Sequence, residues 1–192
     1  RSAHAFAEAI QNAAPEAPVY SVRNYDQTLP VYLGRTVTLV DFIGEGASRI
    51  PLENLAAELD VGQWCRFLGL RSRHAVYDCL HTYDLLVQPS RYEGFGLTVV
   101  EAMAAKVPAL VSDIEGPMEI IENGRHGFFF KNNSPDDCGD KIIELVALSR
   151  EDGFAKKMDE ACEYARSRFS IEATTKQYFR QYNHALRHGN HS

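Results

Sequence analysis

Short apolar segments alternate with helical patterns along the middle of the chain. Strands are predicted at residues 36–43, 64–68, 85–88, 109–112 and 127–130, and helices between them at residues 51–60, 73–83, 96–105 and 117–122. Regular alternation of this kind is typical of parallel strands joined by helical crossovers. The sequence therefore predicts an α/β fold, with a doubly wound, Rossmann-like parallel sheet covered by helices on both faces.

The two ends of the chain differ from this middle part. Residues 2–13 have apolar side chains at helical spacing, and two prolines then close that element. Residues 18–35 show no clear pattern, and we expect an added hairpin or a loop there. From Ser134 the pattern is helical to the end, and it begins with a cap residue, a proline and two carboxylates. A helical C-terminal tail is therefore expected to follow the sheet.

The composition excludes several classes of function. A chain of 192 residues, 45% of them hydrophobic, can bury the core of one compact domain. Its net charge of −6, without basic runs, argues against binding to nucleic acid. No apolar run approaches the roughly twenty residues that a membrane span needs. Because the four cysteines form no C-x-x-C pair, we expect no zinc site and no disulfide framework, but reduced thiols in a cytoplasmic protein.

The segment after the third predicted strand is a candidate ligand loop. In a doubly wound sheet, ligands bind where strands end and helices begin. Pro89 ends the strand, and Gly94 and Gly96 bracket Phe95, which allows something to approach the backbone closely. The helix that begins near Leu97 directs free amides and its positive dipole end into the same space, which suits a diphosphate.

Two glutamates accompany this loop. Glu101 lies in a helix that is apolar on nearly every face and is therefore expected to be buried, where a carboxylate needs hydrogen bonds such as those of ribose hydroxyls. The alternative is that Glu101 caps its own helix or pairs with a structural arginine. Glu93, in the loop itself, can bind sugar hydroxyls or balance a developing cation. The alternative interpretation is that Glu93 is a solvent-exposed loop residue without such a role.

Residues 93–104, EGFGLTVVEAMA, resemble the Glu-x7-Glu signature of glycosyltransferase family 4, the glycosyl transferases group 1, which has the two-domain GT-B fold. Further stretches are similar in order and spacing: residues 44–46, 67–69, 89–90, 108–113 and 116–128. The resemblance is close over residues 38–148. One departure within it is Lys106, which stands where the family often has glycine.

The resemblance implies roles for particular residues. Glu93 would contact the donor sugar as the catalytic candidate, the backbone from Gly94 through Phe95 and Gly96 to Leu97 would hold the distal phosphate and sugar, Glu101 would bind the ribose, and Gly44 and Gly46 would lie beside the nucleotide. It also implies transfer with retention of configuration from a UDP- or GDP-sugar to a glycan or lipid-linked acceptor, as in cell-surface polysaccharide synthesis. No cofactor and no metal are expected.

The resemblance further implies a domain organisation. Residues 1–169 would be a nucleotide-sugar donor-binding domain, truncated at its N-terminal edge, because the family's diphosphate-binding arginine and lysine are absent. Residues 170–192 would be a helix that packs toward an N-terminal acceptor domain preceding Arg1. We therefore expect this fragment alone to be inactive, and the full-length enzyme to associate peripherally with the inner face of the membrane.

The C-terminal helix also carries an apolar seam that would favour self-association if uncovered: Ile171, Thr175, Tyr178, Tyr182 and Leu186. An alternative function is a non-catalytic nucleotide-sugar-binding or assembly module that complements a separate acceptor-domain chain. A nucleotide-sugar epimerase fits the Glu-x7-Glu block less well than a transferase does.

Overall fold

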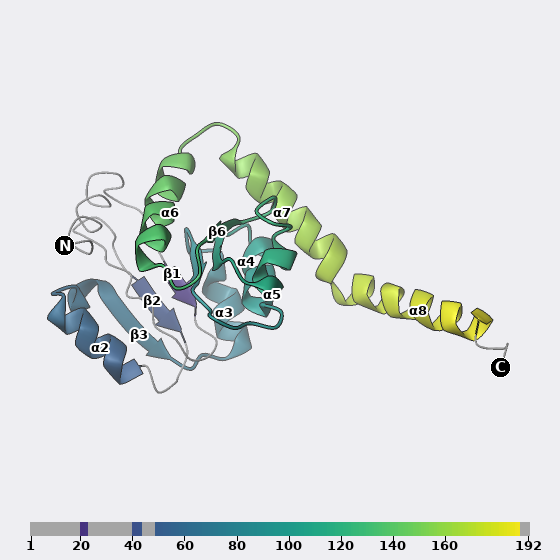
Figure 1. Cartoon of the computed structure of the whole chain (residues 1–192), viewed down its shortest axis with the longest axis horizontal. Coiled ribbons are helices and arrows are strands. Elements are labelled where there is room, and N and C mark those ends of the chain that lie inside the picture. The colour runs from purple at the N-terminus through teal and green to yellow at the C-terminus, as the bar shows by residue number, and fades with distance from the viewer. Residues whose placement is uncertain (1–19, 23–39, 44–48, 189–192) are drawn as a thin grey trace.

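Six parallel strands form one sheet in the order β3-β2-β1-β4-β5-β6 (Figure 1). The computed structural model describes residues 20–22, 40–43 and 49–188. The strands are β1 (Tyr20–Val22), β2 (Val40–Ile43), β3 (Cys65–Gly69), β4 (Leu86–Gln88), β5 (Ala109–Ser112) and β6 (Phe128–Phe130). The predicted doubly wound parallel sheet is confirmed.

Helices cover the sheet and continue into the C-terminal tail. They are α2 (Arg49–Glu58), the 3-10 turn η1 (Gly62–Trp64), α3 (Arg73–Leu80), α4 (Leu97–Ala104), α5 (Glu115–Ile120), α6 (Pro135–Leu148), α7 (Phe154–Phe169) and α8 (Ile171–His188). Their bounds lie within a few residues of the predicted ones, and the tail is helical as expected. The helix predicted at residues 2–13 lies outside the described residues.

Alternate residues of the strands pack into two separate cores. Leu86 and Val111 contribute to a core with α3, α4, α5 and α7, whereas Val87 and Leu110 contribute to one with α6. Side chains of a strand point alternately to its two faces, so this division shows that both faces of the central strands are covered. A strand buried on both sides is mostly apolar, which explains the short apolar runs in the sequence.

The prediction of a hairpin or loop for residues 18–35 is wrong for Tyr20–Val22. These residues form β1, which pairs in parallel with both β2 and β4 in the middle of the sheet. A strand of three residues is too short to show a periodicity, and its backbone pairing with two neighbours determines its conformation. The remainder of residues 18–35 lies outside the described residues.

The end of α4 explains the family's glycine at the position of Lys106. The Lys106 backbone is left-handed, with φ of 60°, its amide donates to Met103 O, and the Val107 amide donates to Ala102 O. This is the Schellman arrangement, in which glycine is the ordinary residue. The lysine side chain reaches Asp159 of α7, with 2.5 Å between Nζ and Oδ1.

The last helix, α8, extends away from the sheet (Figure 1). Its apolar seam is open to solvent: Ile171, Tyr178, Tyr182 and Leu186 are 64 to 82% exposed. Among the described residues, no helix is long and apolar enough to cross a membrane. The division of the chain at residues 169 and 170 into a domain and a separate helix stays a prediction.

Candidate functional site

The loop of residues 89–96 leaves the sheet at its topological switch point. From β1, the chain order runs through β2 and β3 to one edge, and from β4 through β5 and β6 to the other. Connections from neighbouring strands diverge at such a point, and a crevice opens outside their carboxyl ends. The residues that follow β4 therefore lie where doubly wound sheets bind ligands.

Hydrogen bonds hold the Glu93 carboxylate inside this loop. Oε1 accepts from the backbone amide of Phe95 at 3.3 Å, and Oε2 accepts from Nε2 of Gln88 at 3.3 Å. Glu93 is half-buried, unlike the fully exposed loop residue considered as its alternative. The carboxylate thus has a defined orientation beside the amino end of α4.

The two loop glycines have different structural roles. Gly96 is left-handed, with φ of 97°, and is the N-cap of α4, so glycine is favoured there for its backbone. Gly94 needs no such conformation, and a Cβ atom added to it would meet nothing within 4 Å. Gly96 therefore has the unusual backbone angle, whereas Gly94 lies exposed on the loop and leaves room for a close approach.

A third glycine, Gly116 of α5, contributes a close backbone approach that the spacing argument does not identify. A Cβ atom on Gly116 would lie 2.6 Å from Glu93 O and 2.9 Å from Gly94 C. The first turn of α5 is thus pressed against the backbone that carries Glu93. In the sequence, Gly116 is visible only as a glycine directly before Pro117, at the beginning of the stretch 116–128 that resembles the family.

The amino end of α4 remains accessible to solvent. Leu97 is 56% exposed and Phe95 is 44% exposed, and the Phe95 ring contacts Phe169 of α7 edge-on, with 5.7 Å between centroids. The first amides of a helix have no intrahelical acceptor. An anion at this accessible end would be stabilised by those amides and by the helix dipole.

Glu101 pairs with two side chains of α3. Its Oε1 accepts from the Tyr77 hydroxyl at 2.8 Å and lies 3.7 Å from Nη2 of Arg73. Burial, and then the nearby Glu101 carboxylate, raise the pKa of Tyr77, so its hydroxyl keeps the proton that it donates. Among the described residues, no hydrogen bond is made to Glu101 Oε2, and the side chain is 19% exposed. The carboxylate therefore has one oxygen open to a ligand hydroxyl.

The expectation that α4 is buried on nearly every face is wrong in part. Val99, Ala102 and Met103 form its buried side, whereas Leu97 is exposed and Glu101 is half-buried. A long run of apolar residues does not distinguish a helix packed on one side from a fully surrounded one. The alternative for Glu101, pairing with an arginine, is also realised in this structure.

The remaining expectations divide between described and undescribed residues. Gly44 and Gly46 lie outside the described residues, so their place beside a nucleotide stays a prediction. Among the residues that the structure describes, no group of three His, Cys, Asp or Glu side chains is arranged to hold a metal ion. The four cysteines are free.

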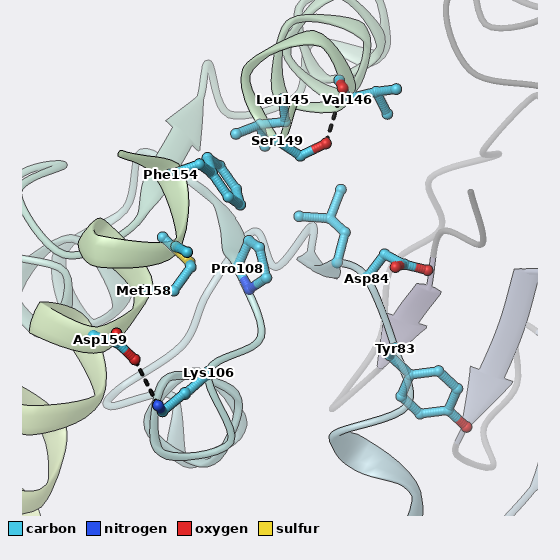
Figure 2. Close-up of a pocket in the computed structure, with 12 residues that line it drawn as sticks. Tyr83, Asp84, Lys106, Pro108, Leu145, Val146, Ser149, Phe154, Met158 and Asp159 are labelled. Atoms are coloured by element: carbon cyan, nitrogen blue, oxygen red, sulfur yellow. Dashed lines mark hydrogen bonds and ion pairs between the residues drawn. The ribbon is translucent and has the colours of Figure 1, made fainter. Parts of the chain in front are cut away.

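A separate cavity of about 490 Å³ lies at the amino ends of β4 and β5, and Figure 2 shows residues that line it. Leu85 and Pro108, which directly precede β4 and β5, line it together with Phe154 and Met158 of α7. Burial raises the pKa of Asp84 at its margin. Because this cavity lies at the amino ends of the strands, it is not part of the crevice beside Glu93.

His126 lies buried in the turn before β6 and next to α7. It is 8% exposed, stacks on Tyr164 with 4.1 Å between ring centroids, and lies 3.3 Å from Glu122 through Nε2. Its Nδ1 is buried without a hydrogen-bond partner among the described residues. Burial lowers the pKa of His126, and the Glu122 carboxylate opposes this only in part.

We expect this histidine to make the fold less stable in acid. A histidine whose pKa is lowered by folding binds its proton more tightly in the unfolded chain. Its effect on the free energy of unfolding is therefore constant above the ordinary pKa of 6.5, and stability falls as the pH drops below that value. Urea unfolding from pH 7.5 to about 5 measures the slope, and His126→Phe, which keeps the stacking ring, should flatten it. An identical slope in both proteins would contradict this account.

Two curated relatives illustrate the sequence similarity of this chain to known proteins. Among curated relatives, the poly(ribitol-phosphate) alpha-N-acetylglucosaminyltransferase of Staphylococcus aureus is 42% identical over 69 residues, which are 35% of this chain and 14% of that protein. A sucrose synthase of Nitrosomonas europaea is 33% identical over 120 residues, which are 60% of this chain and 14% of that protein.

Solved structures share the fold over most of this chain. A glycosyltransferase from Rickettsia africae superposes with a TM-score of 0.78 at 17% identity, covering 96% of this chain and 52% of that one. A variant of S. aureus TarM, solved with fondaparinux, alpha-GlcNAc-glycerol and UDP, superposes with a TM-score of 0.72 at 25% identity, covering 88% of this chain and 36% of that one. The chain thus spans about half or less of the length of these structures.

The doubly wound sheet and these structural neighbours show that the fold is that of one half of the GT-B architecture. Within this architecture, the chain belongs to the family of glycosyl transferases group 1, whose profile matches residues 32–168. The resemblance seen in the sequence is thereby confirmed.

Proposed function

We propose that this chain is the donor-binding half of a retaining glycosyltransferase that takes its sugar from a UDP- or GDP-sugar. The observation that carries the proposal is the pair of glutamates at the amino end of α4, one held inside the switch-point loop and one with a free oxygen. The UDP in the TarM structure supports a nucleotide diphosphate as the donor part. Family membership supports transfer rather than mere binding.

Each element of the site would have a distinct role. Glu101 Oε2 would accept hydrogen bonds from the ribose hydroxyls, and the first amides of α4 would bind the distal phosphate. Glu93 would contact the donor sugar near the developing cation at its anomeric carbon. Helix amides would stabilise the leaving diphosphate, and the proposal includes no metal and no cofactor.

The acceptor would be a glycan or a lipid-linked molecule bound by a second, N-terminal domain. This part of the proposal follows from the shorter span of the chain relative to its matches, since the matched regions are 9 to 29% of the first three curated relatives. We propose a role in cell-surface polysaccharide synthesis in the cytoplasm, at the inner face of the membrane. The present chain would bind the donor weakly and transfer nothing.

Titration calorimetry with a panel of UDP- and GDP-sugars tests the proposal directly. One nucleotide sugar is expected to bind with a dissociation constant between about 1 μM and 1 mM, and the matching nucleoside monophosphate should bind more weakly because it lacks the distal phosphate. A folded chain that binds no member of the panel would overturn the assignment. Glu144→Gln, on α6 and paired with Lys141, is the control whose binding should equal that of the unchanged chain.

A second candidate is an assembly module that complements a separate acceptor-domain chain. The exposed seam of α8, including Tyr178, Tyr182 and Leu186, favours it because such a surface suits a protein partner. It predicts a stable complex with a separately encoded acceptor-side chain, which Tyr182→Glu should weaken. A reading frame that joins both halves in one polypeptide would exclude it.

A further inference from the structure

Gln88 is a buried polar side chain at the carboxyl end of β4. It is 1% exposed, between an apolar strand and the switch-point loop. Burying an amide costs free energy unless its polar atoms are hydrogen-bonded. Gln88 meets this requirement with three side chains: Nε2 lies 3.4 Å from Ser90 Oγ and 3.3 Å from Glu93 Oε2, and Oε1 lies 2.9 Å from Thr98 Oγ1.

The orientation of the amide follows from its partners. An ionised carboxylate can only accept hydrogen bonds, so the amide NH₂ has to face Glu93. The amide oxygen then faces Thr98, whose hydroxyl donates to it from the first turn of α4. A single side chain thus joins the loop glutamate to the helix end where the phosphate would bind.

We propose that Gln88 is a positioning residue of the donor site, a role that rests on the proposed function. It acts through Glu93 and does not itself reach the crevice, since it is buried. Glu93 accepts one bond on each oxygen, from Gln88 and from the Phe95 amide, which fixes the plane of the carboxylate. Each oxygen has a second acceptor position that remains open to a sugar hydroxyl. Without the amide of Gln88, the Glu93 carboxylate would keep only its hydrogen bond from the Phe95 amide among the described residues.

Gln88→Met, which has similar length but no donor, tests the role in two ways. Nucleotide-sugar binding measured by calorimetry should weaken by about tenfold. Hydrogen exchange of the Phe95 amide, measured without ligand, should become faster by at least about tenfold because its acceptor is no longer held. Gln63→Met is the matched control and should leave both readouts unchanged, since within the described ranges the exposed Gln63 amide donates to Asp60 O alone.

Gln88→Glu separates positioning from a purely structural role. The introduced carboxyl group has the same shape but faces Glu93, and two carboxylates so close share a proton at low pH and repel each other when both ionise. Relative to the unchanged chain at the same pH, binding and Phe95 protection should be near normal at about pH 5 and fall toward about pH 8. A side chain that only fills space would lower stability without this dependence.

The outcomes distinguish this inference from the proposed function. If the unchanged chain binds a nucleotide sugar and both variants bind it equally well, Gln88 does not position the site. If the unchanged chain binds none, the proposed function fails, and the exchange of the Phe95 amide still decides whether Gln88 holds Glu93. Equal exchange in the unchanged chain and both variants would overturn the inference in either case.

Discussion

Replacing Glu101 with alanine is expected to weaken nucleotide-sugar binding by about ten- to a hundredfold. The variant loses the free oxygen Oε2, which we assign to the ribose hydroxyls, and hydrogen bonds to a charged acceptor are among the stronger ones in proteins. Tyr77→Phe should weaken binding less, because it removes only the hydroxyl that orients Oε1 from 2.8 Å. Calorimetry with the best nucleotide sugar measures both effects.

Glu101→Ala should leave the fold almost unchanged. The partner side chains, Arg73 and Tyr77, are 67% and 43% exposed, so water replaces the lost carboxylate. We expect the free energy of unfolding to change by less than about 1 kcal/mol, as for ion pairs near the protein surface. Glu144→Ala is the control, because it breaks a comparable surface pair with Lys141 far along the chain. Undiminished binding by Glu101→Ala would show that this carboxylate does not hold the ribose.

Gly116→Ala is expected to disturb both the fold and the donor loop. The new Cβ atom would lie 2.6 Å from Glu93 O and 2.9 Å from Gly94 C, and backbone atoms cannot move aside as a flexible side chain can. Overpacking of this kind costs about 1 to 3 kcal/mol, which urea unfolding would reveal. Because the contact is with the backbone of Glu93 itself, donor binding should be reduced as well, even under conditions in which the variant is fully folded.

Gly94→Ala is the matched comparison, because Gly94 lies in the loop that Gly116 of α5 contacts. Its Cβ atom would meet no atom within 4 Å, so stability should be unchanged within about 0.5 kcal/mol. If the exposed loop faces the donor, the added methyl group should still weaken binding, because it occupies space next to the phosphate. Equal stability of the two alanine variants would contradict the close approach of α5. Undiminished donor binding by Gly94→Ala would contradict the proposed position of the donor next to this loop.

Much of the fold was predictable because its signal is local. The strand at residues 109–112 was predicted with its observed bounds, and the helices between strands were placed within a few residues. A strand buried on both faces is mostly apolar, and a crossover helix needs an apolar stripe, so both are visible in short windows of sequence. By contrast, β1 carries no such pattern in its three residues.

The candidate site was predictable in its loop but not in its surroundings. Glu93 and the N-cap Gly96 were visible from a carboxylate and glycines at a strand end, and the structure places both at the switch point. The contact between Tyr77 and Glu101 was not predictable, because the two residues lie 24 positions apart in the sequence. Gln88 appeared as one polar residue at the end of an apolar strand, a pattern that does not indicate its partners.

By itself, the sequence determined the alternation of strands and helices, the glycine loop after β4 and the glutamate spacing that identifies the family. Only the tertiary structure decided that β1 lies beside β4 to create the switch point, that α5 presses against the loop and that Gln88 bridges Glu93 and Thr98. The physical reason is the range of the interactions. Periodicity and turn chemistry act between near neighbours, whereas strand pairing and the contacts of buried polar groups join segments that meet only after the chain has folded.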